Sequence, residues 1–260
     1  MSATRYICGT SNSTALVTRQ AALLHDALEI LRSEPPGNQI EERFVPILLK
    51  ALLVHGATWG QTHEQLKAIL QDRLTGRNVR EYVAKYLGYG RSASSPLSEC
   101  TAQRATVLGI GELEDGLAHR FSVPLPPSLA GLHGWRRLTA TLCWFSTTNS
   151  KSNKYKSAAL WFATEIGDFV LNRREADARQ AQRGTVQHEI FEGDNAVAFE
   201  DGEEIRILVN CRAHAGKLTE PVPYALVVSL EVAPSVDIPL YNEIRTRLQV
   251  GVPIIASQNP

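Results

Sequence analysis

The chain has 260 residues, of which 43% are hydrophobic and 21% charged, and its 27 basic and 27 acidic side chains leave no net charge. This balance is typical of one large globular domain or two modest ones, and it excludes an intrinsically disordered chain. Nucleic acids and anionic membranes select basic surfaces, so the neutral charge supports neither partner. No apolar run reaches the roughly 18 residues that a membrane-spanning helix needs.

The N-terminal segment and the cysteines indicate a cytoplasmic protein. Residues 1–9 contain no apolar core and are therefore not typical of a signal peptide. The four cysteines are far apart and form no CxxC pair, which argues against a zinc site. We expect reduced thiols, because a disulfide framework would be sparse for this length. The cysteines are Cys8, Cys100, Cys143 and Cys211. The sequence predicts no cofactor and no metal.

The first part of the chain, up to about residue 95, has a helical pattern. Residues 14–32 are apolar on more than one side, which is typical of a buried helix, and the run 33–37 with its two prolines ends it. A second apolar helix is expected over about 42–57. A polar segment that contains Gly76 follows, and after it comes a compact Gly-Tyr-Gly at 88–90.

After residue 95 the apolar residues alternate with period two, which is the pattern of β-strands. The clearest strands are expected at 136–146, 204–210 and 223–232. Weaker candidates are 104–110, 117–123, 157–164 and 184–191. Seven such strands, separated by turns rich in Gly, Pro and Asn, predict a β-sandwich.

Three further expectations concern this second part. The charged stretch 172–183 is predicted to be a solvated loop or a short helix, and a short amphipathic helix is predicted over 239–248. The aromatic residues Trp144, Trp161 and Phe162 are predicted to lie in the core of the sandwich.

Residues 8–18 read Cys-Gly-Thr-Ser-Asn-Ser-Thr-Ala-Leu-Val-Thr, and they carry the chemistry that the sequence supports best. Ser11 is expected at or just before the start of the first helix, where backbone N–H groups lack a partner and point outward. Such groups stabilise an oxyanion that forms beside the serine oxygen. Gly9 permits a tight turn. The alternative is that the Ser and Thr residues simply cap the helix.

This segment resembles the nucleophile motif of the subtilisin-like serine peptidases, or subtilases, whose usual form is Gly-Thr-Ser-x-Ala-x-Pro. Ser11 matches the nucleophile, and Gly9 and Thr10 match the two residues before it. Ser13 stands where a small residue is usual. Ala15 replaces the usual proline, which removes a rigid helix start but no catalytic atom.

Other features extend the resemblance over residues 8–95. The run Leu-Leu-Val-His-Gly-Ala-Thr-Trp at 52–59 resembles the next buried helix of subtilases, and Gly-Tyr-Gly at 88–90 resembles the end of many of their catalytic domains. The runs 123–129 and 136–146 look like the tail of large bacterial subtilases. The resemblance implies an α/β region over 1–95, the C-terminal part of a subtilisin-like catalytic domain. An all-β, jelly-roll-like sandwich over 100–260 would follow it.

The other catalytic groups of the family have no match in this sequence. The family order is Asp, His, an oxyanion-hole Asn and then Ser, and only a few residues precede Ser11. His25 lies 14 residues further along the same predicted helix, roughly 20 Å away and beyond hydrogen-bond reach. His55 is predicted to be a hydrogen-bonded histidine of the core or of a helix cap. The remaining histidines are predicted to lie at the surface: His63, His119, His133, His188 and His214.

Two functions therefore stay open. In the first, the chain is the nucleophile-bearing portion of a subtilase, either truncated or one piece of a split protein, and it is inactive alone. The resemblance then implies a polypeptide substrate and a complementing chain that carries the Asp and His. It also implies an AAA-type ATPase as a partner, since some family members are encoded beside one.

In the second function, the chain is a non-catalytic β-sandwich binding module with a peptidase remnant. Without the parallel sheet of the family, the helices within 14–57 would expose apolar surface, so we expect them to be unstable alone.

Overall fold

Two apolar helices open the structure, as the sequence predicts. The computed structural model describes residues 9–92, 101–131, 133–165, 173–175, 182–196, 203–248 and 255–258. Helix α1 spans Thr10–Arg32. The short 3-10 turns Gly37–Gln39 and Glu42–Phe44 then lead into α2, Val45–His55. A proline lies in the first turn of α2, where its missing N–H breaks no helical hydrogen bond.

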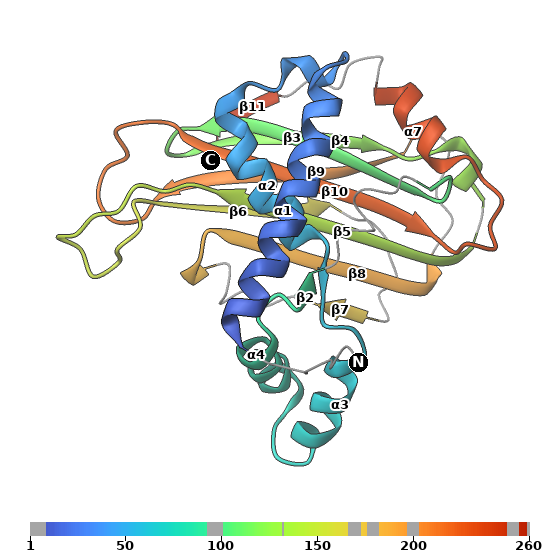
Figure 1. Ribbon diagram of the computed structural model, residues 1–260, viewed down its shortest axis with the longest axis horizontal. Helices are drawn as coiled ribbons and strands as arrows, with labels where there is room; N and C mark the ends of the chain where they lie inside the picture. Colours follow the sequence, from blue (N-terminus) through green and yellow to red (C-terminus); the bar gives the residue numbers. More distant parts are fainter. Residues whose placement is uncertain are drawn as a thin grey trace, which may run out of the picture.

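A helical hairpin follows α2 where the sequence analysis predicts only a polar segment. Its helices are α3, Gly60–Gln71, and α4, Gly76–Leu87. A small core of its own holds the hairpin together, formed by Trp59, Val79, Val83 and Ala84. Strand β1, Ala57–Thr58, precedes the hairpin, and the antiparallel strand β2, Arg91–Ser92, follows it, so the hairpin projects from a two-stranded base. In Figure 1 both helices lie to one side of the large sheets.

The larger of the two main sheets has five antiparallel strands in the order β3-β10-β5-β8-β7. Their bounds are β3 Arg104–Leu113, β5 Gly134–Trp144, β7 Arg173–Glu175, β8 Val186–Ala196 and β10 Val222–Val232. Four of these strands were predicted. The charged stretch 172–183 was not expected to contain one, yet its residues 173–175 form β7. Residues 182–183 are also described, and the rest of that stretch lies outside the described residues.

The second sheet has four antiparallel strands in the order β11-β4-β9-β6. Their bounds are β4 Leu117–Pro124, β6 Ala158–Glu165, β9 Glu204–Ala213 and β11 Ile255–Gln258. Three of the four were predicted. A 3-10 turn at Pro127–Leu129 and helix α7, Leu240–Leu248, complete the described elements, and α7 confirms the helix that was predicted over 239–248. The described residues thus combine helices with antiparallel sheets.

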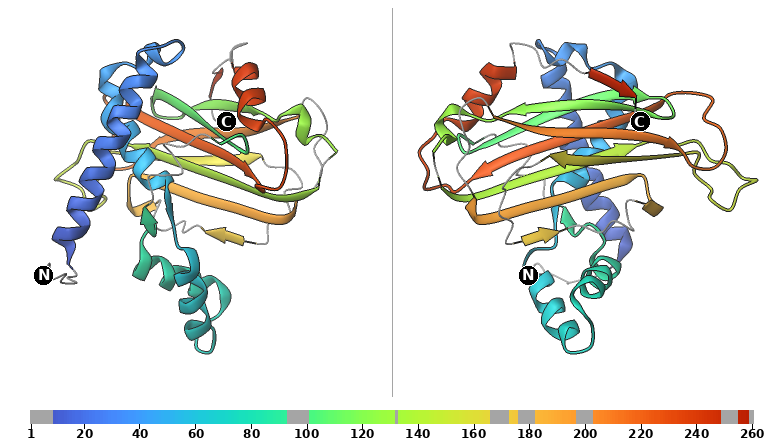
Figure 2. Two further views of the ribbon diagram at one scale, coloured as in Figure 1. Left: turned by 45° about the vertical axis from the view of Figure 1, so that its right-hand side comes forward. Right: turned by 180° about the vertical axis from the view of Figure 1, so that it is seen from behind.

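Three layers result from this arrangement, with the five-stranded sheet in the middle. Its inner face shares a core with the four-stranded sheet, to which Leu138, Leu142, Trp144 and Tyr224 contribute fully buried side chains. Its outer face is covered by α2, which packs on β5 and β10, and α1 packs on α2. Figures 1 and 2 show α1 and α2 on one side of the sheets. Because β5 and β10 are covered on both faces, they are buried almost continuously.

The burial of the aromatic residues tests the predicted core. Trp144 and Phe162 are buried, as predicted. Trp161 is not, because it lies on the opposite face of β6 from Phe162 and is 37% exposed.

The predicted boundary near residue 95 separates mostly helical from mostly stranded sequence. One cluster of buried residues nevertheless runs across it, from Leu24 and Leu28 of α1, through α2, to both sheets. The division into 1–95 and 100–260 stays a prediction.

Candidate functional site

Ser11 lies in the first turn of α1, and its side chain is exposed. Gly9 occupies the position before the helix with φ of 156°, a backbone conformation that residues with side chains rarely adopt. Among the described residues, no side chain caps the helix, which does not support the capping alternative. The first backbone N–H groups of α1 thus have no cap from a described side chain, as the oxyanion interpretation requires.

The hydroxyl groups around Ser11 differ in what they bond. Ser13 donates to the carbonyl of Gly9 at 3.4 Å, and Thr14 donates to that of Thr10 at 2.9 Å. These bonds to the preceding turn tie both hydroxyls to the helix backbone. Ser11 makes no such bond to any residue that the structure describes. Its hydroxyl, like that of the exposed Thr10 beside it, is therefore available to a molecule outside the described chain.

No general base reaches Ser11 from the described residues. His25 lies on α1 itself, four turns away, and His55 is engaged in a buried network with Thr141 and Ser229. A serine hydroxyl without an adjacent base is a weak nucleophile. The predicted motif residues Gly9, Thr10 and Ser11 thus lie together at the start of α1, while a histidine and a carboxylate are not assembled around them among the residues described.

Helix α1 carries a row of exposed apolar side chains beyond Ser11. Leu16, Leu23 and Ile30 recur every seven residues and are 62%, 49% and 71% exposed. Residues at this spacing lie on one face of a helix, and we call the three the α1 stripe. Only Leu24 and Leu28 of the helix are buried, on a different face. Such an unpaired row of large apolar side chains is typical of a surface that contacts another protein.

The Gly-Tyr-Gly segment ends α4 and returns the chain to the sheets. Gly88 terminates the helix with φ of 59°, and Gly90 has φ of 99°. A side chain at Gly90 would collide with the backbone of Thr58, because β1 and β2 pair at this point. Tyr89 donates a hydrogen bond to the carbonyl of Val186 at 3.2 Å. The described contacts of this segment are structural.

The histidines are distributed differently from the sequence prediction in two cases. His55 is buried with both ring nitrogens hydrogen-bonded, which confirms its prediction. His188 and His63 were predicted at the surface, but both are buried. His188 lies on the outer face of β8, which α2 and β1 cover, and His63 packs against Trp59 in the hairpin.

The other three histidines agree better with a surface position. His133 is exposed, and His119 and His214 are partly exposed. His119 Nδ1 lies 2.6 Å from the hydroxyl of Tyr224, and burial lowers the pKa of this histidine.

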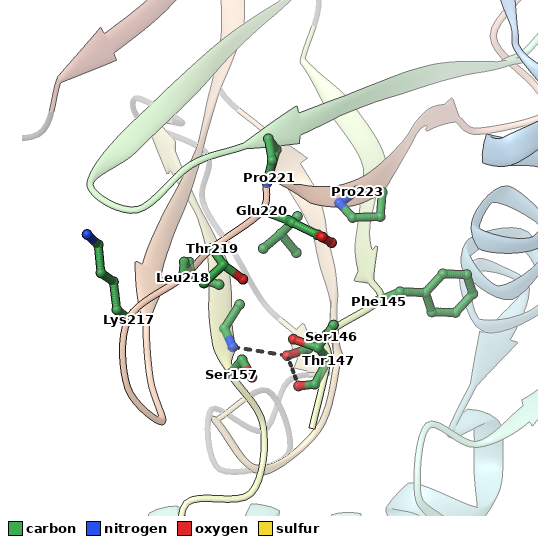
Figure 3. A pocket seen from close by; sticks show the side chains of 12 residues that line it. Phe145, Ser146, Thr147, Ser157, Lys217, Leu218, Thr219, Glu220, Pro221 and Pro223 are labelled. Atoms are coloured by element: carbon green, nitrogen blue, oxygen red, sulfur yellow. Dashed lines mark hydrogen bonds between the residues drawn. The ribbon is translucent and has the colours of Figure 1, made fainter. Parts of the chain in front are cut away.

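A cavity of about 350 Å³ lies at one end of the sheets. Its wall comes from the segment after β5, the start of β6 and the segment that leads into β10, namely Phe145–Thr147, Ser157–Ala158 and Lys217–Pro223. Figure 3 shows Ser146 beside Thr147, with the ring of Phe145 pointing away from both. The Ser146 hydroxyl donates to the carbonyl of Thr147 and accepts from the N–H of Ala158, both at 3.0 Å. Because the Ser146 hydroxyl is already occupied by these two bonds, it is a poor candidate for a nucleophile. The cavity is better suited to binding a ligand.

The part of the chain that the structure describes has neither a metal-binding cluster nor a membrane-spanning helix. It contains no group of three or more His, Cys, Asp or Glu side chains that are placed to hold a metal ion. Of the helices in the described ranges, none has the length and apolar character to cross a membrane. Cys143 and Cys211 are buried free thiols, and burial raises the pKa of each to about 12. Cys8 and Cys100 lie outside the described residues.

Comparison of the chain with family models, with curated proteins and with solved structures finds no match. The subtilase resemblance therefore rests on the motif around Ser11 and on the segments that follow it.

Sequence reasoning missed two features around these sites. The hairpin of α3 and α4 has a signal in the spacing of Val79, Val83 and Leu87, which recur every four residues as on one face of a helix. The burial of His188 has no local signal, because it depends on α2, more than a hundred residues earlier in the chain.

Proposed function

We propose that this chain is the nucleophile-bearing C-terminal portion of a subtilisin-like serine endopeptidase. The observation that carries the proposal is the exposed Ser11 hydroxyl in the uncapped first turn of α1, within the Gly-Thr-Ser motif. The α1 stripe supports it, because the helix that follows the nucleophile would pack on a catalytic sheet that the described residues do not contain. The finer fold, a partial subtilisin-like domain followed by a jelly-roll-like sandwich, is part of the same proposal.

The reaction would proceed through an acyl-enzyme on Ser11. The hydroxyl oxygen attacks the carbonyl carbon of a peptide bond, and its proton passes to a histidine of a completing polypeptide, which an aspartate orients. The oxyanion is stabilised by the backbone N–H of Ser11 and an asparagine of the completing polypeptide. The histidine then protonates the departing amine. Water hydrolyses the ester and releases the carboxylic acid product, which regenerates the serine.

The proposal includes the partners and the compartment that the resemblance implies. They are a polypeptide substrate, a completing segment with the Asp and His, and an AAA-type ATPase. The buried free thiols of Cys143 and Cys211 support a reducing compartment such as the cytoplasm. The chain alone is expected to be inactive, because removal of the histidine and aspartate leaves only a small residual rate.

A fluorophosphonate probe tests the proposal, since it labels only serines that a base and an oxyanion hole activate. The purified chain would be treated with and without a separately produced subtilase segment that carries the Asp, His and Asn motifs. Labelling is expected only with that segment. It should vanish in Ser11→Ala and persist in Ser13→Ala, a matched control because Ser13 is exposed in the same turn but bonded to Gly9. Labelling that survives Ser11→Ala, or no labelling under any condition, would contradict the proposal.

The cavity at the end of the sheets favours a second candidate, a non-catalytic binding module. Its wall combines the charged Lys217 and Glu220 with Pro221 and Pro223, a mixture that suits a small polar ligand or a peptide. Screening a peptide library by NMR would test this function. Binding that shifts resonances of residues 217–223 and is lost when Thr147→Trp fills the cavity would support it, whereas shifts unaffected by that substitution would count against it.

A further inference from the structure

A network of hydrogen bonds runs beneath α2 across the outer face of the five-stranded sheet. It includes two buried histidines, one on α2 and one on β8. In spatial order its members are Thr106 of β3, Ser229 of β10, His55 of α2, Thr141 of β5, His188 of β8 and the carbonyl of Ala57 in β1. We call this set the histidine network. It connects four strands of one sheet to α2 and to the base of the helical hairpin.

The distances between its members define five consecutive links. From Thr106 to Ser229 the oxygens are 2.7 Å apart, and from Ser229 to Nε2 of His55 the distance is also 2.7 Å. Nδ1 of His55 lies 2.9 Å from Thr141, whose hydroxyl lies 2.7 Å from Nδ1 of His188. Nε2 of His188 lies 3.1 Å from the carbonyl oxygen of Ala57. All five links are within hydrogen-bond range.

The carbonyl of Ala57 fixes the direction of every link. A carbonyl oxygen can only accept, so His188 carries its proton on Nε2, and its Nδ1 accepts from Thr141. Thr141 has a single hydroxyl proton, and it must therefore accept from Nδ1 of His55. The Nε2 of His55 is then an acceptor for Ser229, which accepts in turn from Thr106. This order holds for neutral imidazoles, and it puts the two rings in opposite tautomers.

An additional proton breaks this order at either histidine. A protonated His188 would point an N–H at Thr141, which already accepts from His55, and the Thr141 proton would lose its acceptor. A protonated His55 would point an N–H at Ser229 and reverse the links as far as Thr106. A buried polar hydrogen without a partner destabilises the packed state by about 1–3 kcal/mol.

In the described part of the chain, no charged group bonded to the ring nitrogens would offset the positive charge of an additional proton. None of the four ring nitrogens bonds a carboxylate. The charged side chains that face the network are Arg104, paired with Glu231 at 2.7 Å, and Arg137, which lies 3.8 Å from Glu192. Lys50, on the preceding turn of α2, bonds the carbonyls of Trp144 and Thr185. The ring of Tyr89 packs edge-on against His188.

The pKa values of the two histidines agree with this geometry. Burial is the main cause that holds the pKa of His55 well below its usual value; a proton on His188 and the charges of Arg104 and Arg137 lower it as well. The pKa of His188 is lowered to about 4, chiefly by burial; the hydrogen bond to Ala57 opposes the shift, and Arg137 makes a smaller contribution that also lowers the pKa. The unfolded or detached state thus binds more protons than the packed state. The stability is full above the usual histidine pKa of 6.5, and it is lost as the pH falls toward 4.

We infer that the histidine network is an acid-sensitive latch, which holds α2 and β1 on the five-stranded sheet while both imidazoles are neutral and loosens this attachment in mild acid. Because α1 packs on α2, its attachment would be loosened as well. The inference concerns the attachment of the helical layer, and it holds whether or not the proposed peptidase function is correct.

Hydrogen exchange of the full chain, followed by mass spectrometry and corrected for the intrinsic effect of pH, tests the latch. For one histidine with the pKa shift of His188, the opening constant of residues 45–59 should rise roughly 30-fold between about pH 7.5 and pH 5. Strand β10, in the same sheet, should respond much less. A rise of equal size in α2 and β10 would indicate global acid unfolding and would overturn the inference.

Variants identify the histidines as the source of the response. The double substitution His55→Gln and His188→Gln should reduce the response of residues 45–59 to less than about threefold, because neither glutamine titrates. The exposed His133→Gln is the matched control, and it should keep the full response. An undiminished response in the double variant would refute the latch.

Nitrogen-15 NMR of the imidazoles of the unsubstituted chain gives a second measurement, which does not depend on whether the variants fold. It should show the proton of His55 on Nδ1 and that of His188 on Nε2 near neutral pH. The same tautomer on both rings, or a charged ring in the packed state near neutral pH, would contradict the network on which the inference rests.

Discussion

Helices α1 and α2 are both rich in apolar residues, but they are in opposite environments. Of the eleven residues of α2, six are buried, including Ile47, Leu48 and Ala51 with no exposed surface. Of the 23 residues of α1, two are buried, and five of its large apolar side chains are exposed. Apolar composition predicts that a helix needs a partner surface, but it does not say whether the same chain supplies one.

The partner surface of α2 is the outer face of β5 and β10. Small and β-branched side chains on this face, such as Thr139, Ala225 and Val227, let the helix approach closely. No equivalent surface faces the α1 stripe among the described residues. α2 is therefore part of the two-sheet core, whereas the described residues leave the α1 stripe uncovered.

The largest expected effect is at the centre of α2. Substitution Leu48→Ala removes a fully buried side chain and leaves a cavity against the sheet, so it should lower the free energy of unfolding by roughly 2–5 kcal/mol. The matched Leu16→Ala in α1 removes an exposed side chain and should change it by about 0.5 kcal/mol or less. Urea unfolding measures both. Equal losses would mean that α1 is covered in solution.

A smaller effect is expected within α1 itself, from two adjacent leucines. Leu24 packs on α2, whereas Leu23 is in the α1 stripe. Leu24→Ala should destabilise the chain by about 2 kcal/mol, at the lower end of the usual range because only one side of the helix is packed. Leu23→Ala should have almost no effect. Chemical denaturation distinguishes the two variants, and a reversed order would mean that α1 is rotated from its position here.

Removal of the whole α1 stripe is expected to affect stability less than either Leu48→Ala or Leu24→Ala. Combining Leu16→Gln, Leu23→Gln and Ile30→Gln should change the free energy of unfolding by less than about 1 kcal/mol. The same variant should bind less of a dye such as ANS, which fluoresces on exposed apolar surface. It should also no longer be labelled at Ser11 in the presence of the completing segment. Unchanged dye binding would show that the stripe is not an exposed surface.

The sequence predicted the strands well because alternation of apolar and polar residues is a local signal. All seven predicted strands are present, and so are the two apolar helices and α7. The strand β7 was missed because its three residues, Arg-Arg-Glu, are charged. The hairpin of α3 and α4 was missed because its mostly polar surface hides the small core around Trp59 and Val83.

The environment of the candidate site was harder to predict, because it depends on distant parts of the chain. The motif at Ser11 is contiguous, so its place at a helix start was predictable. The sequence did not predict that α2 would be covered and α1 largely exposed, since apolar periodicity is similar in a covered and an uncovered helix. The burial of His188 was missed for the same reason: an outward-facing residue of an antiparallel strand is usually solvated unless a helix covers that face.

The wide separation in sequence between α2 and its docking surface has a consequence for synthesis of the protein. Residues 45–55 emerge from the ribosome long before β10, Val222–Val232, completes the surface that buries them. At the usual rate of about 5–20 residues per second, the intervening chain takes roughly 9–35 seconds to make. During that interval α2 has α1 to pack on but not the sheet, so its sheet-facing apolar side chains are exposed on the nascent chain.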